Sequence, residues 1–444
     1  MGLYMVIQKF GVSDREEHPH TEREQDMSIR YQSTRGDGGA SKSFEEVVMG
    51  GLAADGGLYV PHCIPNMTQE EIESLRNKSF ADVAFVVISK FVSAQDVPEA
   101  ALKDIVDKSF STFRIPNVVE VVKLQDFFVL ELFHGPTFAF KDVALQFLGN
   151  LFEHFLEHGH GVNGKRQGKL TILGATSGDT GSAAIHGLRG KRNVNCFILF
   201  PEGKVTDIQQ RQMTSISDEN VHCMSIAGDF DDAQSIVKAA FADAAFREEV
   251  SLGAVNSINW ARILAQISYY FYAYLQVASP KQQTAAVNFA VPTGNFGDIL
   301  AGWYAKQMGL PVAKLVIATN ENDVLHRFMQ TGNYTKSAST LSIAPSMDIS
   351  VSSNFERYLY YLAGSDSGKL AVWMKGFEST GSVSVSAQEL SQAQEDFMSC
   401  CCSSSSIVLT MRSTFDEACY LLCPHTATAA HAVKVLQLPS VNTV

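Results

Sequence analysis

Short apolar runs alternate with longer amphipathic stretches between residues 121 and 320. The short runs predict strands at residues 127–133, 169–175, 193–200, 221–228, 287–294 and 314–320. The longer stretches predict helices over residues 141–158, 181–190, 231–246, 259–276 and 297–309. This alternation predicts an α/β fold with a largely parallel sheet covered by helices. Because such sheets bind ligands at the carboxyl ends of their strands, we expect the chemistry in the strand-to-helix turns.

The remaining stretches divide the chain further. Residues 28–120 carry a mostly helical, amphipathic pattern that is interrupted by a turn at 55–61, which predicts an N-terminal helical domain. Residues 1–27 are polar and mix both charges, so we expect a disordered extension. Residues 121–444 then form the α/β part, in which we expect two subdomains. Within it, the low-complexity run CCCSSSS at 400–406 predicts a loop.

Composition narrows the classes of partner. The net charge of -12 argues against a nucleic-acid-binding surface, since phosphate backbones are bound by clustered Lys and Arg. No apolar run is long enough to span a bilayer, so no membrane association is expected. The eight cysteines include no CxxC pair, which argues against a zinc site, and we expect no metal. Reduced thiols predict a cytoplasmic protein.

The first candidate turn, at 131–142, contains Lys141 at the start of a predicted helix, beside Phe138 and Phe140. Apolar surroundings and the positive end of a helix both favour loss of a proton from an ammonium group. A neutral lysine amine is the nucleophile that Schiff-base chemistry requires. Taken alone, the same position fits a solvated surface lysine better, because most lysines are solvated.

Two further turns contain groups that suit an anion. The turn GATSGDTGSAA at 174–184 has glycines that allow a ligand to approach the backbone, and hydroxyls at Ser177 and Thr180. The turn VPTGNFGDILAG at 291–302 places the amides of residues 294–297 in a potential phosphate nest. Each turn also fits an ordinary strand-to-helix connection. Together the three turns suit a phosphorylated aldehyde cofactor, with an amine to condense and a neutral cradle for its phosphate.

These motifs make the chain similar to a known family. Four segments, ELFHGPTFAFKDVALQF (131–147), GATSGDTGSAAI (174–185), GAVNSINWARILAQ (253–266) and PTGNFGDILAG (292–302), resemble threonine synthases of the fungal and enterobacterial branch. The resemblance extends from residue 28 to residue 433. It implies a type II pyridoxal-phosphate fold with an added N-terminal domain.

The resemblance also implies a reaction and a set of site residues. The family converts O-phospho-L-homoserine and water into L-threonine and phosphate with pyridoxal 5'-phosphate, and Lys141 matches the lysine that forms the Schiff base. The residues that match the cofactor-phosphate loop are Gly294, Asn295, Phe296 and Gly297. Those that match the loop gripping the substrate are Thr176, Ser177, Asp179 and Thr180. Arg262 is a candidate ligand of the substrate phosphate, and a structural salt bridge is the alternative.

One segment departs from the family. The family continues past a segment like CPHTATAAHAV (423–433) into a strand ending in S-T-x-H-P-x-K-F, whose Thr contacts the pyridine nitrogen, whereas this sequence reads KVLQLPSVNTV. We therefore expect an incomplete C-terminal end of the catalytic domain, and we do not assign that role to Thr426 or Thr428. Three functions stay open: a threonine synthase, a related phospho-lyase giving 2-oxobutyrate, and a catalytically impaired paralogue or truncated product.

Overall fold

The structure is a computed structural model, and it describes residues 29–161, 168–253, 255–278, 286–439 and 442–444. The extension expected at residues 1–27 lies outside these ranges. No helix within them is both long and apolar enough to cross a bilayer.

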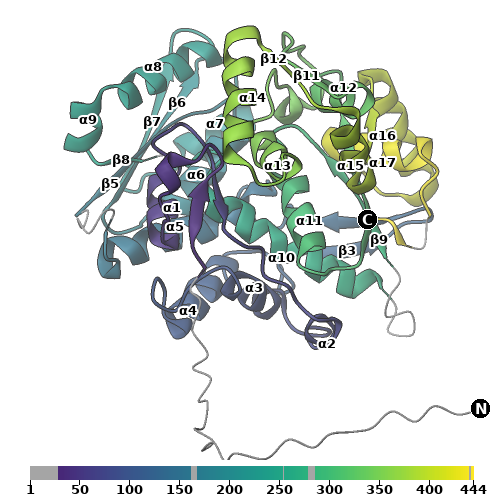
Figure 1. The fold of residues 1–444 in the computed structure, drawn as a ribbon, viewed down its shortest axis with the longest axis horizontal. Coiled ribbons are helices and arrows are strands. Elements are labelled where there is room, and N and C mark those ends of the chain that lie inside the picture. The colour runs from purple at the N-terminus through teal and green to yellow at the C-terminus, as the bar shows by residue number, and fades with distance from the viewer. Residues whose placement is uncertain (1–28, 162–167, 254, 279–285, 440–441) are drawn as a thin grey trace, which may run out of the picture.

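A four-stranded parallel sheet forms one half of the α/β part (Figure 1). Its strands are β5 (Leu170–Ala175), β6 (Val194–Pro201), β7 (Val221–Ile226) and β8 (Leu252–Gly253). They lie in the order β7-β6-β5-β8. The helices between them are α6 (Asp179–Leu188), α7 (Asp207–Thr214), α8 (Phe230–Ala242) and α9 (Ala244–Glu249). The apolar runs at 169–175, 193–200 and 221–228 are thereby confirmed as strands.

A three-stranded parallel sheet forms the other half. Its strands are β9 (Val287–Pro292), β10 (Val312–Thr319) and β13 (Phe397–Cys401), in the order β13-β10-β9. Its helices are α11 (Gly297–Gln307), α12 (Val324–Thr331), α15 (Ala387–Asp396), α16 (Ser404–Ala418) and α17 (Pro424–Val435). Figure 1 shows α8 and α9 at one side of the molecule and α16 and α17 at the other. The predicted parallel arrangement is therefore present as two sheets.

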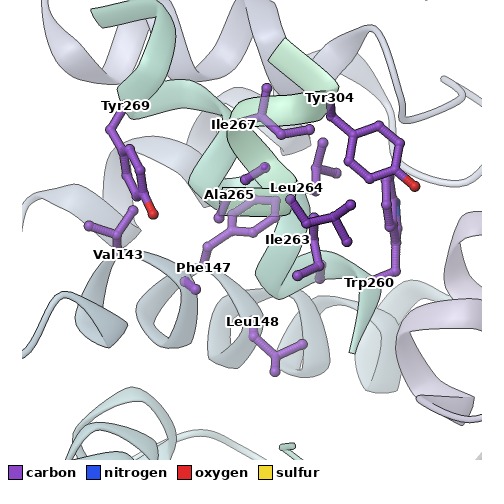
Figure 2. Packing of buried hydrophobic residues seen from close by; sticks show 14 of the residues in the cluster. Val143, Phe147, Leu148, Trp260, Ile263, Leu264, Ala265, Ile267, Tyr269 and Tyr304 are labelled. Carbon is purple, nitrogen blue, oxygen red and sulfur yellow. The ribbon is translucent and has the colours of Figure 1, made fainter. Parts of the chain in front are cut away.

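Two long helices, α5 (Lys141–His158) and α10 (Trp260–Val277), form the centre of the core between the sheets. Every side chain of α10 from Trp260 to Leu275 is buried, as expected for a helix surrounded by protein. Figure 2 shows α10 packed against Phe147 and Leu148 of α5, and against Tyr304 of α11. The ring centroids of Trp260 and Tyr304 are 5.1 Å apart in an edge-to-face arrangement. Both helices begin at a candidate site motif, so this packing fixes the motifs relative to each other.

The N-terminal part is mostly helical, as predicted. Its helices are α1 (Phe44–Gly50), α2 (Gln69–Glu73), α3 (Phe80–Ser89) and α4 (Glu99–Phe110). Ser43 and Thr68 begin α1 and α2 with reciprocal capping boxes, which satisfy free amides of the first turns. An antiparallel pair that the sequence did not predict, β1 (Tyr31–Ser33) and β2 (Tyr59–Pro61), precedes and follows α1, with the short 3-10 helix η1 (Asp37–Gly39) between them.

The remaining elements connect these parts. They are β3 (Glu120–Lys123), β4 (Phe128–Glu131), β11 (Asn333–Thr335), β12 (Ser382–Ser384), the 3-10 helix η3 (Pro345–Met347), α13 (Phe355–Leu362) and α14 (Ser367–Thr380). The strand expected at 127–133 exists as β4, but it pairs antiparallel with β3. Its apolar run could not reveal this, because a buried run has the same pattern in either kind of pairing.

The prediction of a loop at 400–406 is wrong. Cys400 and Cys401 end β13, where they lie opposite Ala318 and Thr319 of β10. Ser403 is the N-cap of α16 and accepts a hydrogen bond from the Ser406 amide. Cysteine packs as a small apolar residue and serine favours helix caps, so a repetitive sequence supplied both a strand end and a helix start.

The last residues extend the second sheet. Thr443 forms a parallel bridge with Asn288, and the Val444 amide donates to the Asn288 carbonyl at 2.9 Å. On the other side, the Phe128 amide donates to the Thr443 carbonyl at 2.8 Å. The sequence pattern indicated no strand here, yet residues 442–444 join β9 to the β3–β4 hairpin. Thr428, in contrast, lies within α17 and donates to the His425 carbonyl.

Candidate active site

Lys141 is the first residue of α5, at the end of a tightly held loop. The fully buried Asp142 carboxylate accepts hydrogen bonds from the Thr137 amide and the Thr137 hydroxyl, both at 2.8 Å. Burial raises the pKa of Asp142 to about 6. A Cβ at Gly135 would lie 2.5 Å from the Asp142 Cβ, so only glycine fits beside it. The loop thus presents Lys141 in a fixed direction.

The surroundings of Lys141 are not apolar, and that prediction is wrong. Its Nζ lies 2.5 Å from Asp179 Oδ2, and 4.7 Å from the centroid of the Phe140 ring. Phe138, the other expected neighbour, is 57% exposed. Burial opposes ionisation of Asp179, but the Lys141 ammonium and hydrogen bonds from Lys141 and Ser346 outweigh it and hold the pKa of this carboxyl well below its usual range. The pair is therefore an ion pair that connects the start of α5 to the turn after β5.

Asp179 is the first residue of α6, in the turn that follows β5. Buried Thr176 shapes this turn, since its hydroxyl oxygen accepts from the amides of Gly178 at 3.0 Å and Gly181 at 2.9 Å. Gly178 has φ 147°, a backbone conformation that other residues rarely adopt. Ser177 is exposed and Thr180 is half-buried, so both hydroxyls remain accessible. Thr176 holds the loop together, whereas Ser177 and Thr180 line its open side.

The turn after β9 forms a cradle of free amides. Within the described ranges, the amides of Gly294, Asn295, Phe296 and Gly297 donate no hydrogen bond to a protein group. Phe296 has φ 63°, and its buried side chain anchors the turn against Phe355. Free amides at a helix N-terminus suit an anion, because the helix dipole adds to their partial charge. The cradle therefore fits a phosphate group without a basic side chain.

A segment that the sequence did not assign to the site supports this cradle from behind. The Ser352 hydroxyl donates to the Gly294 carbonyl at 2.7 Å, and the Asn354 amide donates to the Asn295 carbonyl at 3.0 Å. These hydrogen bonds to the Gly294 and Asn295 carbonyls fix the turn, and its amides remain free to bind a ligand. Both residues lie in the SMDISVSSNFERYLYYL segment (346–362), which contains no charge pattern typical of a phosphate site.

Arg262 lies in the first turn of α10 and is buried, with 3% exposure. Its guanidinium donates to the Val255 carbonyl at 3.1 Å, while its Nε has no partner among the described residues. Burial lowers the pKa of Arg262 to about 10, and the nearby Asp179 opposes this shift. Among the residues that the structure describes, the Arg262 guanidinium makes no salt bridge, so it is able to bind an anion.

Ser346, which the sequence did not assign to the site, lies against Asp179 and is itself held by His425. The Ser346 hydroxyl donates to Asp179 Oδ2 at 2.7 Å, and the Ser346 amide donates to His425 Nε2 at 3.2 Å.

One group of potential metal ligands also exists in the described part of the chain, formed by Glu120, Glu131 and His134. Glu131 already accepts from the Tyr420 hydroxyl at 2.5 Å and contacts His134 at 2.8 Å, so these two members of the group have partners within the protein.

Family comparisons agree along most of the chain. Residues 30–110 match the family described as threonine synthase N terminus. Residues 112–372 match the family of pyridoxal-phosphate-dependent enzymes. The second match contains Lys141 and all three candidate turns.

Relatives and solved structures agree with these matches. The chain is 50% identical over 423 residues to threonine synthase of Schizosaccharomyces pombe, which covers 90% of this chain and 82% of the relative. Identity to the Saccharomyces cerevisiae enzyme is 46% over 430 residues, covering 91% and 83%. The structure resembles pyridoxal-phosphate-bound threonine synthase from Brucella melitensis with a TM-score of 0.89 and 43% identity, covering 94% and 88%. The chain therefore belongs to the threonine synthase family of pyridoxal-phosphate-dependent enzymes, which have the type II fold.

Proposed function

We propose that this protein converts O-phospho-L-homoserine and water into L-threonine and phosphate. The observation that carries the proposal is the position of the Lys141 amine, 2.5 Å from Asp179, in a fold that also holds a cradle of free amides at residues 294–297. An amine suits the cofactor's aldehyde, and free amides suit its phosphate. The family's need for pyridoxal phosphate is thus matched by the donors present.

The proposed cofactor contacts follow from the cradle. The amides of Gly294, Asn295, Phe296 and Gly297 would hold the phosphate, and Lys141 would carry the aldehyde carbon. Bound pyridoxal phosphate supplies an electron-accepting ring that stabilises negative charge on the substrate carbons. The phosphate would need no basic side chain in this cradle, because the N-terminus of α11 provides a positive field.

Lys141 is the proposed acid and base. With the substrate bound, its Nζ can take a proton from the substrate Cα or Cβ and deliver one to Cγ or back to Cα. Asp179 supports this role, because its charge stabilises the ammonium form between the two transfers. Phosphate leaves from Cγ, and water adds at Cβ.

Substrate recognition is proposed for the opposite turn and for Arg262. We infer that the turn of Thr176, Ser177, Asp179 and Thr180 binds the substrate amino acid: Thr176 shapes the turn, and the accessible hydroxyls of Ser177 and Thr180 suit the substrate carboxylate. Arg262 is the proposed ligand of the substrate phosphate, supported by its unpartnered Nε and by its burial. A guanidinium in such surroundings binds an oxyanion strongly.

Product analysis tests the proposed function. The purified chain is incubated with pyridoxal phosphate and O-phospho-L-homoserine, and the products are identified by mass spectrometry. We expect threonine and phosphate in equal amounts, and no turnover by Lys141→Ala. Lys375→Ala, which alters an exposed lysine of α14, is the matched control and should retain activity. Release of 2-oxobutyrate in place of threonine would identify the phospho-lyase instead, and turnover by Lys141→Ala would contradict the assignment of the lysine.

We also propose a cytoplasmic location. All eight cysteines are free, including the adjacent pair Cys401 and Cys402, which is the state expected in a reducing compartment. Fractionation of cells that express the tagged chain tests this, and recovery in an organelle fraction would contradict it.

A further inference from the structure

Ser346 shares one oxygen of Asp179 with Lys141. The Lys141 Nζ and the Ser346 Oγ approach the same atom, Asp179 Oδ2, at 2.5 and 2.7 Å. A hydrogen bond from a hydroxyl withdraws negative charge from a carboxylate oxygen. Ser346 therefore weakens the hold of Asp179 on the proton of Lys141, while also fixing the direction of the carboxylate.

The position of Ser346 is itself fixed from two sides. Its amide donates to His425 Nε2 at 3.2 Å, so that this nitrogen acts as an acceptor. His425 is held in the first turn of α17, where its carbonyl accepts from the Thr428 hydroxyl at 2.7 Å. Asn320 holds the other end of the segment through Asp348, at 2.6 Å. Ser346 thus cannot leave Asp179 without disturbing two elements.

The same segment touches the amide cradle. A Cβ on Gly294 would lie 3.1 Å from the Met347 Cα and 3.2 Å from the Ser346 carbonyl oxygen. The 3-10 helix η3 is therefore in contact with the proposed phosphate loop at Gly294 and with the ion pair at Asp179. It is the element that connects the amine and the cradle.

We propose that Ser346 is a positioning residue that tunes the Lys141–Asp179 pair, and that His425 holds Ser346 in place to do so. This inference rests on the proposed function, in which Lys141 carries the cofactor. Without the Ser346 hydroxyl, Asp179 Oδ2 bears more charge and retains the proton on Lys141 more tightly. Proton transfer from Lys141 to the substrate then becomes harder, although substrate binding is unaffected.

The test compares Ser346→Ala with Ser346→Thr in the full holoenzyme. The absorbance of the bound cofactor is titrated with pH, and kcat and KM are measured separately. For Ser346→Ala we expect the titration midpoint to rise by about half to one pH unit. We also expect kcat to fall about tenfold with KM changed less than about threefold. Ser346→Thr keeps a hydroxyl and should restore both values. Ser379→Ala, on α14, is the control for loss of a serine hydroxyl.

His425 is tested by a second pair of variants. His425→Gln keeps an acceptor for the Ser346 amide and should behave like the wild type, whereas His425→Leu should shift the midpoint in the same direction as Ser346→Ala. A normal absorbance band with unchanged midpoint and kcat in Ser346→Ala overturns the role of Ser346 alone. A wild-type protein in which the lysine-bound cofactor band is missing overturns the proposed function as well, so the two failures are distinguishable.

Discussion

The first glycine of the amide cradle, Gly294, faces backbone atoms, which cannot move aside as a side chain can. At Gly294 the nearest atoms to an added Cβ belong to the backbone of Met347 and Ser346. At Gly376, in α14, no atom lies within 4 Å of an added Cβ. Replacing each glycine with alanine therefore distinguishes the general effect of losing a glycine, at Gly376, from the effect of displacing the cradle, at Gly294.

We expect Gly294→Ala to weaken retention of pyridoxal phosphate by about tenfold or more, because relief of overpacking moves the cradle amides. Gly376→Ala should bind the cofactor normally and should be slightly more stable, since alanine is the better helix former. Equilibrium dialysis measures retention. Equal retention by both variants would contradict the location of the phosphate.

Asp142 gives a prediction about pH. Its pKa is raised from 3.8 to about 6 by burial, so the folded protein binds this proton more tightly than the unfolded chain. Its contribution to stability is fully present below the unfolded value and is lost as the pH rises through about 6. A shift of about two units corresponds to about 3 kcal/mol. The free energy of unfolding, relative to that of Asp142→Asn, should therefore fall by up to this amount between about pH 4 and pH 7. A constant difference would contradict the raised pKa.

At the residue scale, sequence motifs indicated Lys141 and the three turns, but not Ser346 or His425. Ser346 and Asp179 are 167 positions apart in the chain, and Ser346 and His425 are 79 apart. No local pattern can predict such contacts, because they depend on how the two sheets are placed. The same holds for the Lys141–Asp179 ion pair, because its residues are 38 positions apart and belong to different turns.

At the scale of elements, the alternating pattern predicted five strands of the two sheets, and α5 has the predicted limits. It did not predict β8, β13, α7 or α12. The helix predicted at 231–246 is divided at Asp243 into α8 and α9. The spacing of apolar and polar residues indicates which side chains are buried, so it predicts elements that have a buried face. The same spacing does not indicate which strands pair with each other, so it did not predict the antiparallel β3–β4 hairpin or the β1–β2 pair. At 400–406 the repetitive composition hid a helix that depends on a serine cap and on packing against α17.

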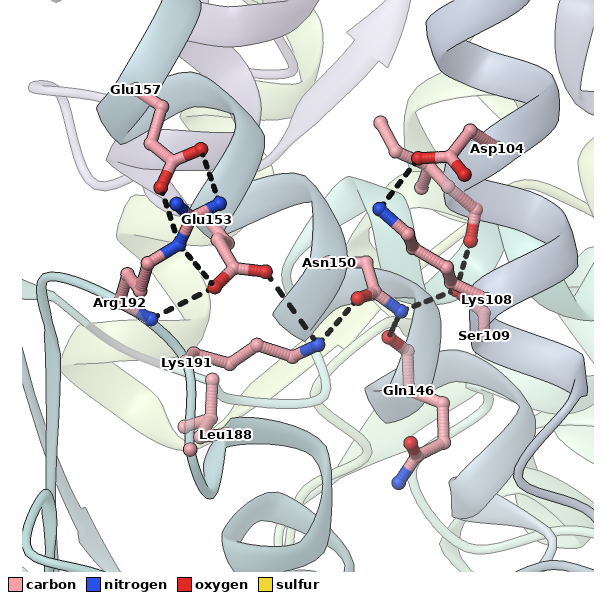
Figure 3. A network of polar contacts seen from close by, with 12 residues as sticks. Asp104, Lys108, Ser109, Gln146, Asn150, Glu153, Glu157, Leu188, Lys191 and Arg192 are labelled. Carbon is pink, nitrogen blue, oxygen red and sulfur yellow. Dashed lines mark hydrogen bonds and ion pairs between the residues drawn. The ribbon is translucent and has the colours of Figure 1, made fainter.

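A polar network joins the N-terminal part to the catalytic part (Figure 3). Asn150 of α5 donates to the Ser109 hydroxyl of α4 at 2.9 Å and accepts from Lys191, which follows α6. Lys191 also lies 3.9 Å from Glu153, and burial lowers its pKa. Asn150 is thus the residue through which α4, α5 and the chain after α6 are connected.

We expect Asn150→Leu to destabilise the protein by about 1 to 3 kcal/mol, because half-buried Lys191 loses the oxygen to which it donates and keeps only Glu153, 3.9 Å away. The double variant Asn150→Leu with Lys191→Met removes both polar groups and should recover most of this loss. Urea unfolding of the four proteins in the cycle measures the coupling. Additive losses would contradict a direct interaction between the two side chains.

At the scale of the whole molecule, the candidate site draws on both sheets. Asp179 begins α6, which follows β5 of the four-stranded sheet, and the 294–297 cradle follows β9 of the three-stranded sheet. Lys141 begins α5, and Arg262 lies in the first turn of α10; these are the two central helices between the sheets. A ligand that touches the amine and the cradle at once therefore links the two halves of the molecule, and its binding energy adds to their association.

Thermal unfolding tests this arrangement. At a pyridoxal phosphate concentration of about 100 times the Kd, binding adds about 2.7 kcal/mol, which corresponds to a rise in Tm of about 3 °C for a chain of this size. Lys141→Ala loses the covalent link but keeps the cradle, so its Tm should rise less. Pyridoxal, which lacks the phosphate, should raise the Tm of the wild type less than pyridoxal phosphate does, because it leaves the amides of residues 294–297 unfilled. Equal shifts with the two ligands would mean that the cradle contributes nothing, and that the two halves are not joined through the cofactor.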